Sequence, residues 1–368
     1  MTLIELAALR TEVLWAAFAV SCVFGWVAQR THFCTMGAIS DVVNMGDWTR
    51  LRMWVLAVAV AILGFYGLAA FGAIDASKNF YTAPRVVWLS ALVGGALFGF
   101  GMVLASGCGS KTLVRMGAGS LKALVVFAVM GIAAFASLRG VTAVLRVNTV
   151  DRVAFDMPGG SGLPGWLARA LDVPGAATVA AVCVALGLLI WVFRSADFRQ
   201  ANNVLAGVGI GACVVAMWWV TGHMGFVPEH PETLEAVFVG TPSGLMEALT
   251  FTAPMAYAID WLVLFSDTSK LLTTAIVSVV GVVLGSFVYA VATRSFHWEG
   301  FSSTQDTAVH IVGAALMGVG GVTAMGCTVG QGLSGLSTLS LTSVLAVVGI
   351  VLGAVAALRF QMWLVMRD

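Results

Sequence analysis

The chain has 368 residues, of which 60% are hydrophobic and 10% are charged, and its formal net charge is +1. The mean hydropathy is +0.97, whereas an average soluble domain has about 25% charged residues. The composition excludes a soluble enzyme, a nucleic-acid-binding domain and a disordered chain, and it predicts an all-α polytopic membrane protein in contact with the lipid bilayer.

Nine apolar runs are long enough to cross the bilayer core, which takes about 20 helical residues. A tenth run, residues 245–265, carries Glu247, Pro254 and Asp260, which are costly at mid-bilayer on a lipid-facing helix. We expect this run to form a re-entrant or interfacial helix. The nine predicted spans are 13–28, 53–74, 86–107, 121–138, 176–193, 204–220, 271–292, 308–326 and 341–366.

Four polar or glycine-rich stretches lie directly against predicted spans, at residues 29–47, 107–119, 222–240 and 326–335. Irregular backbone survives at membrane depth only where protein buries it or where it lines a cavity. We therefore expect the functional site at these breaks. Residues 139–174, which hold four Arg, three Asp and three Pro, predict an ordinary exposed loop instead.

Two segments of the chain repeat each other. Residues 94–108 (GGALFGFGMVLASGC) and 313–327 (GAALMGVGGVTAMGC) align without gaps, and nine of the fifteen positions are identical. The flanking halves each hold four predicted spans with 176–193 between them, so equivalent spans are five apart. Five is odd, so the two halves must have opposite topology, as in transporters built from inverted repeats.

The repeat divides the chain into three predicted parts. The parts are a first repeat (1–140), a loop with a linking transmembrane helix (141–200) and a second, inverted repeat (201–368).

The basic residues weakly favour a cytoplasmic C-terminus, because eleven of the nineteen Lys and Arg residues then lie inside.

Three cysteines stand at the breaks: Cys34, Cys108 and Cys327, each flanked by glycine and small hydroxyl residues. Such a sequence ends one helix and starts another, whose unpaired N–H groups attract an anion. A thiol is a weak, polarisable hydrogen-bonding group that would hold a soft sulfur anion loosely enough to release it. We predict that these three line a substrate path. The other cysteines are predicted to pack inside spans; they are Cys22, Cys183 and Cys213.

The six cysteines are scattered without a CxxC pair, which argues against a metal site, an iron–sulfur cluster and a disulfide framework. Five polar residues near the three path cysteines are candidates for the path or its mouth. The alternatives are interfacial flanks, snorkelling side chains and helix caps. The five are Arg30, His32, Ser110, Lys111 and Gln331.

Three further residues carry weaker expectations. His223 lies in the second-half break that resembles the Cys34 break, which has no cysteine. Asp41 and Asp260 are the acidic residues best placed to carry a coupling proton. Helix capping or a buried hydrogen bond is the alternative for both.

Residues 30–37 (RTHFCTMG), 99–109 (GFGMVLASGCG) and 318–332 (GVGGVTAMGCTVGQG) resemble the YeeE/YedE family of sulfur-transport membrane proteins. The resemblance implies thiosulfate uptake across the bacterial inner membrane, without a cofactor, through an hourglass of inverted repeats. It also implies that the ion passes by hydrogen bonds between the thiols of Cys34, Cys108 and Cys327. A small cytoplasmic TusA-like sulfur-carrier protein is the implied partner.

Two alternatives stay open. One is a membrane sulfurtransferase or thiol enzyme that uses cysteine persulfides, although well-separated single cysteines count against it. The other is a transporter of another sulfur or selenium oxyanion. The chain has no Walker motif, so it has no signature of ATP hydrolysis, and the sequence leaves the source of energy open.

Overall fold

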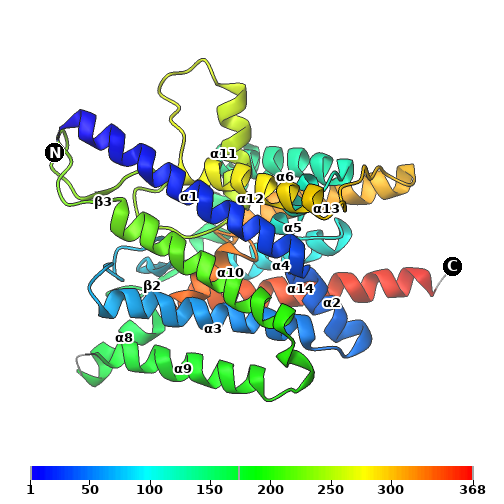
Figure 1. Ribbon diagram of the computed structural model, residues 1–368, viewed down its shortest axis with the longest axis horizontal. Helices are drawn as coiled ribbons and strands as arrows, with labels where there is room; N and C mark the ends of the chain where they lie inside the picture. The colour runs from blue at the N-terminus through cyan, green and yellow to red at the C-terminus, as the bar shows by residue number, and fades with distance from the viewer. Residues whose placement is uncertain (1, 173–174, 367–368) are drawn as a thin grey trace.

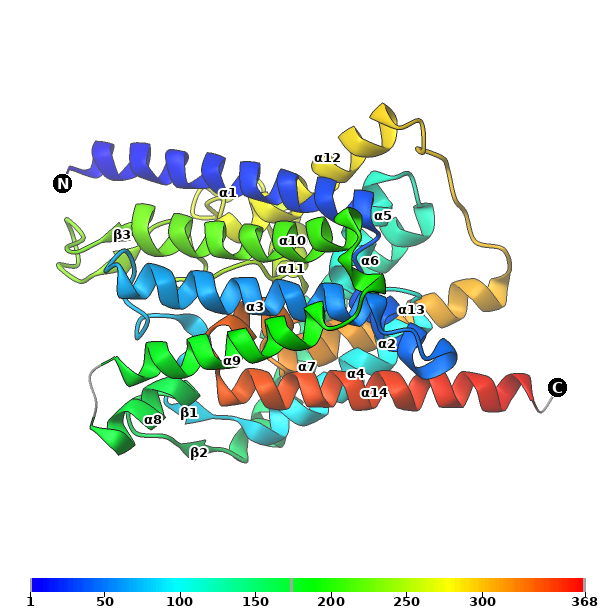
Figure 2. The ribbon, with the colours of Figure 1, turned by 60° about the horizontal axis from the view of Figure 1, so that its bottom comes forward.

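The computed structural model of the chain is almost entirely helical and describes residues 2–172 and 175–366. Within these ranges nine helices are long and apolar enough to cross a membrane, which confirms the predicted all-α polytopic class. The two chain ends lie at opposite ends of the bundle (Figure 2), as an odd number of crossings requires. The nine helices are α1 (Leu3–Thr31), α3 (Thr49–Ala70), α4 (Trp88–Leu104), α6 (Leu121–Arg139), α9 (Ala176–Phe193), α10 (Ala201–Trp219), α12 (Thr274–Ala292), α13 (Thr304–Thr323) and α14 (Leu341–Val365).

Shorter elements connect these helices, and some of them, such as α8 beside α9, lie at the edge of the bundle (Figure 1). The tenth apolar run contains α11 (Thr252–Val263), a helix of 12 residues. At about 1.5 Å per residue it is too short to cross the hydrocarbon core. The other short elements are α2 (Thr35–Met45), α5 (Gly109–Gly117), α7 (Val141–Asn148), α8 (Leu163–Leu171) and the antiparallel strand pairs β1 (Arg85–Val86) with β2 (Phe155–Asp156) and β3 (Phe226–Val227) with β4 (Val237–Phe238).

The predicted exposed loop at 139–174 is wrong for the residues described, because α7, β2 and α8 give it a fold of its own; 173–174 lie outside the described residues. Ser161 is fully buried there, and its carbonyl accepts a hydrogen bond from the Leu341 N–H at 2.9 Å. Backbone pairing with distant segments, which composition does not reveal, satisfies these polar groups. The segment therefore forms a cap over one end of the bundle.

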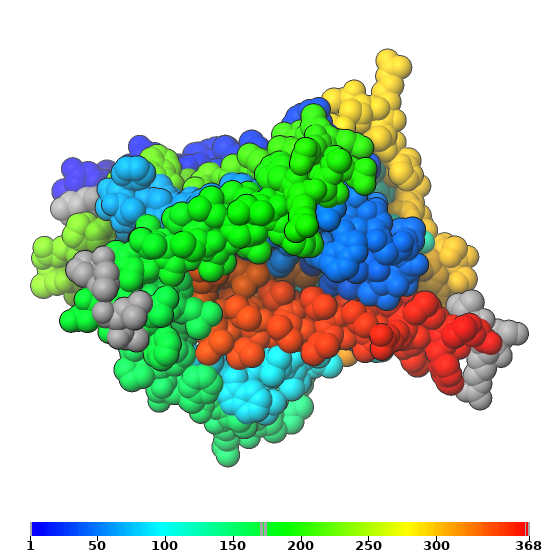
Figure 3. All heavy atoms as spheres, turned by 90° about the horizontal axis from the view of Figure 1, so that it is seen from below, coloured from blue at the N-terminus to red at the C-terminus, as the bar shows by residue number. Residues whose placement is uncertain are grey.

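Large apolar side chains cover the outside of the bundle. Ile132, Ile190 and Leu352 are each more than 60% exposed, and Figure 3 shows α14 open on one such face. An apolar exterior of this extent is stable against lipid rather than water.

Helices α4 and α13, which carry the repeated segments, pack against each other through glycine. A Cβ atom at Gly94 would lie 2.8 Å from the Gly320 carbonyl oxygen, and one at Gly101 would lie 2.6 Å from that of Gly313. Gly94 aligns with Gly313 and Gly101 with Gly320 in the repeat. Exchanging the two halves therefore converts the Gly94–Gly320 contact into the Gly101–Gly313 contact.

The same exchange holds for other helix pairs. Helix α1 packs on α12 as α10 packs on α3, and α4 packs on α14 as α13 packs on α6. An internal twofold axis would produce these exchanged pairs. The inverted repeat stays a prediction, and this pattern supports it.

The glycine contacts predict which positions tolerate a methyl group. In Gly99→Ala the new methyl would overlap the Ile350 carbonyl of α14, whereas Gly67→Ala meets nothing within 4 Å. Overpacking of this kind costs about 1–3 kcal/mol. We expect Gly99→Ala to lower the thermal unfolding temperature in detergent and Gly67→Ala to leave it unchanged or higher; equal unfolding temperatures would contradict the packing argument.

Candidate functional site

Cys34 and Cys108 each stand at the N-cap of a short helix, as predicted. The Cys34 Sγ atom accepts a hydrogen bond from the Gly37 N–H at 3.4 Å, at the start of α2. The Cys108 Sγ atom lies 3.3 Å from the Ser110 hydroxyl, at the start of α5. Extended backbone at the two cysteines separates each short helix from the long helix before it. Both thiols therefore face backbone N–H groups at a helix N-terminus, where an anion is favoured.

The fold brings Cys34 and Cys108 together and places Thr328, which follows Cys327 in the chain, beside them. The side chains of Cys34 and Cys108 interact directly, and Thr328 also reaches the Cys108 thiol. The Cys327 Sγ atom lies 3.9 Å from the Thr250 hydroxyl. Cys108 and Cys327 are fully buried. We call this continuous series the thiol chain: Thr250, Cys327, Thr328, Cys108 and Cys34.

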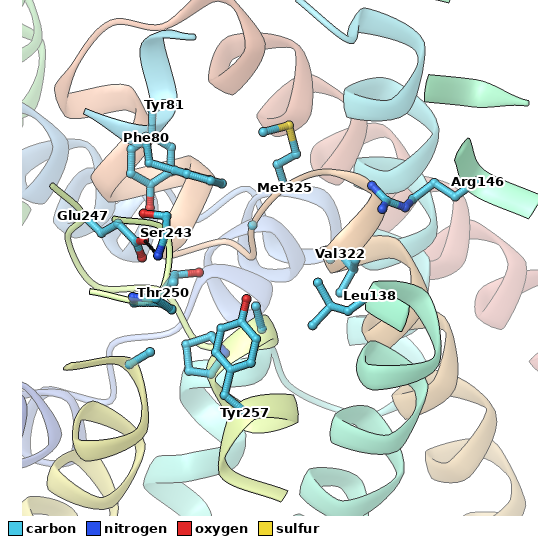
Figure 4. A pocket seen from close by; sticks show the side chains of 16 residues that line it. Phe80, Tyr81, Leu138, Arg146, Ser243, Glu247, Thr250, Tyr257, Val322 and Met325 are labelled. Carbon is cyan, nitrogen blue, oxygen red and sulfur yellow. Dashed lines mark hydrogen bonds between the residues drawn. The ribbon is translucent and has the colours of Figure 1, made fainter. Parts of the chain in front are cut away.

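A cavity of about 310 Å³ lies against one end of the thiol chain, and we call it the vestibule. Thr250 belongs both to its wall and to the thiol chain. Figure 4 shows Glu247 and Thr250 on one side of the vestibule and Arg146 on the opposite side. The walls come from the turn before β1, from α7, and from the segment that leads into α11. Thr250 therefore connects the vestibule to Cys327, which is fully buried and does not itself line the cavity.

Two charged side chains of opposite sign line the vestibule. Arg146 pairs with Asp151 at 3.0 Å, and its Nε atom is buried without a hydrogen-bond partner. Glu247 accepts a hydrogen bond from the Ser243 N–H at 3.1 Å, and burial raises the pKa of its carboxyl group. The sequence flagged Glu247 only as unfit for a span, and Arg146 was missed because it lies in the presumed loop.

Cations gather at the opposite end of the thiol chain. Lys111 is partly buried and lies near both Cys34 and Cys108. His32 is exposed nearby, close to Lys111 and Arg50. Arg50, which sequence reasoning missed, pairs with Asp41 at 3.3 Å. This end of the site therefore carries an excess of positive charge.

Two of the candidate path residues are engaged elsewhere. Arg30 is exposed and lies over the Trp26 ring, 5.3 Å from its centroid. Gln331 donates to the Ala324 carbonyl at 2.7 Å and accepts from the Ser343 hydroxyl at 2.5 Å. Both ends of the Gln331 amide are thus bonded to protein beyond the end of α13, which fits the alternative of a cap.

The three residues with weaker expectations also make contacts with other side chains. Asp41 and Asp260 both form ion pairs, the latter with Lys270 at 2.6 Å, as in the alternative to proton carriage. His223 is exposed and stacks on Trp219. The remaining cysteines lie within α1, α9 and α10, where Cys213 is buried, Cys22 is half-buried and Cys183 is exposed on the outer face. The prediction of a packed side chain is therefore wrong for Cys183.

Thr250, like Cys34, precedes a short helix that packs on a long helix of its own half of the chain. Thr250 lies just before α11, which packs on α12, and Cys34 lies just before α2, which packs on α3. The β3–β4 pair lies between His223 and α11. A gapless comparison of the two halves does not detect this insertion.

A model of the sulphur transport family matches residues 30–356. The thiosulfate transporter TsuA of Escherichia coli is 26% identical over 88% of this chain and 87% of its own length, and TsuA of Spirochaeta thermophila is 26% identical over 93% and 97%. The probable transporter YedE of Salmonella typhimurium is 29% identical over 30% of this chain and 26% of its own. Because the match covers nearly the whole chain, the resemblance found in the three cysteine motifs is confirmed, and the chain belongs to the YeeE/YedE sulphur transport family.

Proposed function

We propose that the chain takes up thiosulfate across the bacterial inner membrane, and that the ion moves along the thiol chain. The observation that carries the proposal is the continuity of this series between the vestibule and the cationic end around Lys111. The relatives named as thiosulfate transporters match along most of their own length, which favours the same substrate here.

The charges of the two ends favour a direction. Helix α5, which holds Lys111, and the start of α3, which holds Arg50, lie toward the end of the bundle where α14 ends (Figure 2), and cationic loops favour the cytoplasm. The vestibule then faces the outside of the membrane. A dianion entering there would move toward increasing positive charge.

The chemistry of thiols explains passage without tight binding. An S–H group is a weak hydrogen-bond donor, and the thiol sulfur is polarisable, so each cysteine interacts with thiosulfate without holding it for long. Conduction needs several sites that are each favourable enough to enter and weak enough to leave. Three thiols in succession, of which those of Cys108 and Cys327 are fully buried, would meet this requirement without a fixed charge in the narrowest part.

The proposal includes two inverted halves that meet at this path. Cys108 and Cys327 occupy aligned positions of the repeat, and the exchanged glycine contacts of α4 and α13 hold the two helices together. Substrate sites of transporters with inverted repeats lie near the bilayer midplane, between the halves.

The contact between Cys34 and Cys108 favours a second candidate, a membrane sulfurtransferase, because it brings together cysteines that are far apart in sequence. In that reaction a cysteine thiolate would attack the outer sulfur of thiosulfate, a persulfide would form and sulfite would leave. A TusA-like protein on the cytoplasmic side would suit either function as the acceptor of sulfur.

The deciding experiment measures uptake of radiolabelled thiosulfate by a thiosulfate-dependent bacterium without its own transporters, with and without this chain. We expect uptake that depends on the chain, with no persulfide accumulating on the purified protein. Stoichiometric persulfide on Cys34, detected by mass spectrometry, would favour the enzyme. Absence of uptake in membranes that contain the folded chain, with and without a TusA-like protein, would contradict transport.

Serine substitutions test the assignment of the path. We expect Cys34→Ser, Cys108→Ser and Cys327→Ser each to reduce the initial rate of uptake about tenfold or more, because a hydroxyl lacks the polarisability of sulfur. The matched controls Cys22→Ser, Cys183→Ser and Cys213→Ser should stay within about twofold of the unmodified chain, a range that corresponds to less than about 0.5 kcal/mol. Similar losses in all six variants would refute the assignment.

The position of the Glu247 carboxyl group in the vestibule leads us to expect that uptake depends on pH. The carboxyl shares the vestibule with Arg146, Tyr81 and Tyr257, and its raised pKa keeps it protonated to higher pH than an ordinary glutamate. As the pH rises through that pKa a carboxylate forms and repels the entering dianion. We expect uptake to fall with rising pH, and we expect this fall to vanish in Glu247→Gln. The control is Glu235→Gln on the exposed loop; an unchanged pH profile in Glu247→Gln would contradict the prediction.

A further inference from the structure

Two threonine hydroxyls lie beside thiols of the path. The Thr250 hydroxyl lies 3.9 Å from the Cys327 Sγ atom, and Thr328 lies against the Cys108 thiol. The structure therefore contains two successive stations that each join one thiol to a threonine hydroxyl; the Ser110 hydroxyl, 3.3 Å from the Cys108 Sγ atom, also belongs to the inner one. The vestibule station is Thr250 with Cys327, and the inner station is Thr328 with Cys108.

The Thr328 hydroxyl is unusual for a buried group. The residue is 1% exposed, and its Oγ1 atom has no hydrogen-bond partner of proper geometry. A buried hydroxyl without a partner costs about 1–3 kcal/mol, so most buried polar side chains are paired. Thr323, five residues earlier, shows the usual arrangement, because its hydroxyl donates to the Val319 carbonyl at 2.8 Å. An unpaired hydroxyl beside a path cysteine is thus available to a passing ion.

The position of Thr250 in the fold also favours contact with a passing ion. It precedes α11 as Cys34 precedes α2, and it contacts Cys327 as Cys34 contacts Cys108. The Thr250 side chain also reaches the vestibule wall. A residue in this place meets the ion before Cys327 does.

We propose that Thr250 and Thr328 are ion-contacting residues that give the path its preference for an anion with one sulfur end and one oxygen end. This inference rests on the proposed transport of thiosulfate. At each station the hydroxyl donates to the oxygens of the ion, because O–H is the stronger donor for a hard oxygen. The thiol contacts the terminal sulfur, which is softer and more polarisable.

The pairing has a consequence for selectivity. An oxyanion without a sulfur end, such as sulfate, would meet only one suitable group at each station. A path of thiols alone would make little distinction between the two ends of thiosulfate.

Valine substitutions remove each hydroxyl while keeping the shape of threonine. We expect Thr250→Val and Thr328→Val to reduce the ratio of Vmax to KM for thiosulfate uptake about tenfold, because each loses a hydrogen bond to a charged ligand. Thr250→Ser and Thr328→Ser keep the hydroxyl and should restore uptake to within about threefold. The matched control is Thr323→Val, whose hydroxyl bonds only within its own helix.

The thermal unfolding temperature of the purified protein without thiosulfate separates an ion contact from a structural role. Since the Thr328 hydroxyl is unpaired in the folded protein, Thr328→Val should unfold at the same or a higher temperature. A lower unfolding temperature with a proportional loss of uptake would show a structural role and overturn the inference. Normal uptake by both valine variants would overturn it while the transport proposal stands. Absence of uptake by the unmodified chain would instead refute the transport proposal, and the inference with it.

Discussion

The close approach of α4 and α13 through glycine is the contact on which the rest of the site depends. The Gly94–Gly320 and Gly101–Gly313 contacts leave no room for a side chain between the helices. Cys108 and Cys327 follow the ends of these two helices. The helices run in opposite directions, because the first half of α4 meets the second half of α13 at Gly94–Gly320 and the second half of α4 meets the first half of α13 at Gly101–Gly313. The segments that follow the two helices therefore leave from opposite ends of this contact, and they must turn back to bring Thr328 beside the Cys108 thiol.

A second constraint is that the backbone groups at each break between helices must find hydrogen-bond partners inside the membrane protein. Each break exposes N–H and C=O groups that must be satisfied without water. At Cys34 and Cys327 the thiol itself accepts a backbone N–H, from Gly37 and Gly330, both at 3.4 Å. The cysteines thus stabilise the turns that place them. Sulfur accepts weakly, so these N–H groups remain available to a stronger acceptor such as an oxyanion.

A feature of the fold or site could be predicted from the sequence only where the residues that determine it are close together along the chain. Local patterns indicated the spans and the three cysteine turns, because hydrophobic length and glycine content act within a few residues. The roles of Thr250, Arg146 and Glu247 depend on segments that meet only in the fold, and no local pattern marks them. The segment at 139–172 looked like a loop because composition does not reveal its backbone pairing with distant segments, as Ser161 pairs with Thr82 and Leu341.

The absence of full charges along the thiol chain itself has a physical reason. A lysine or arginine at the narrowest point would bind a dianion strongly in a low-dielectric environment, and strong binding there would slow release. The cations instead stand at the two ends, with Arg146 beside the vestibule and Lys111 beyond Cys108. Helix N-termini, thiols and hydroxyls offer several weak interactions between them. An ion that is attracted at both ends and held loosely between them can move along the whole path.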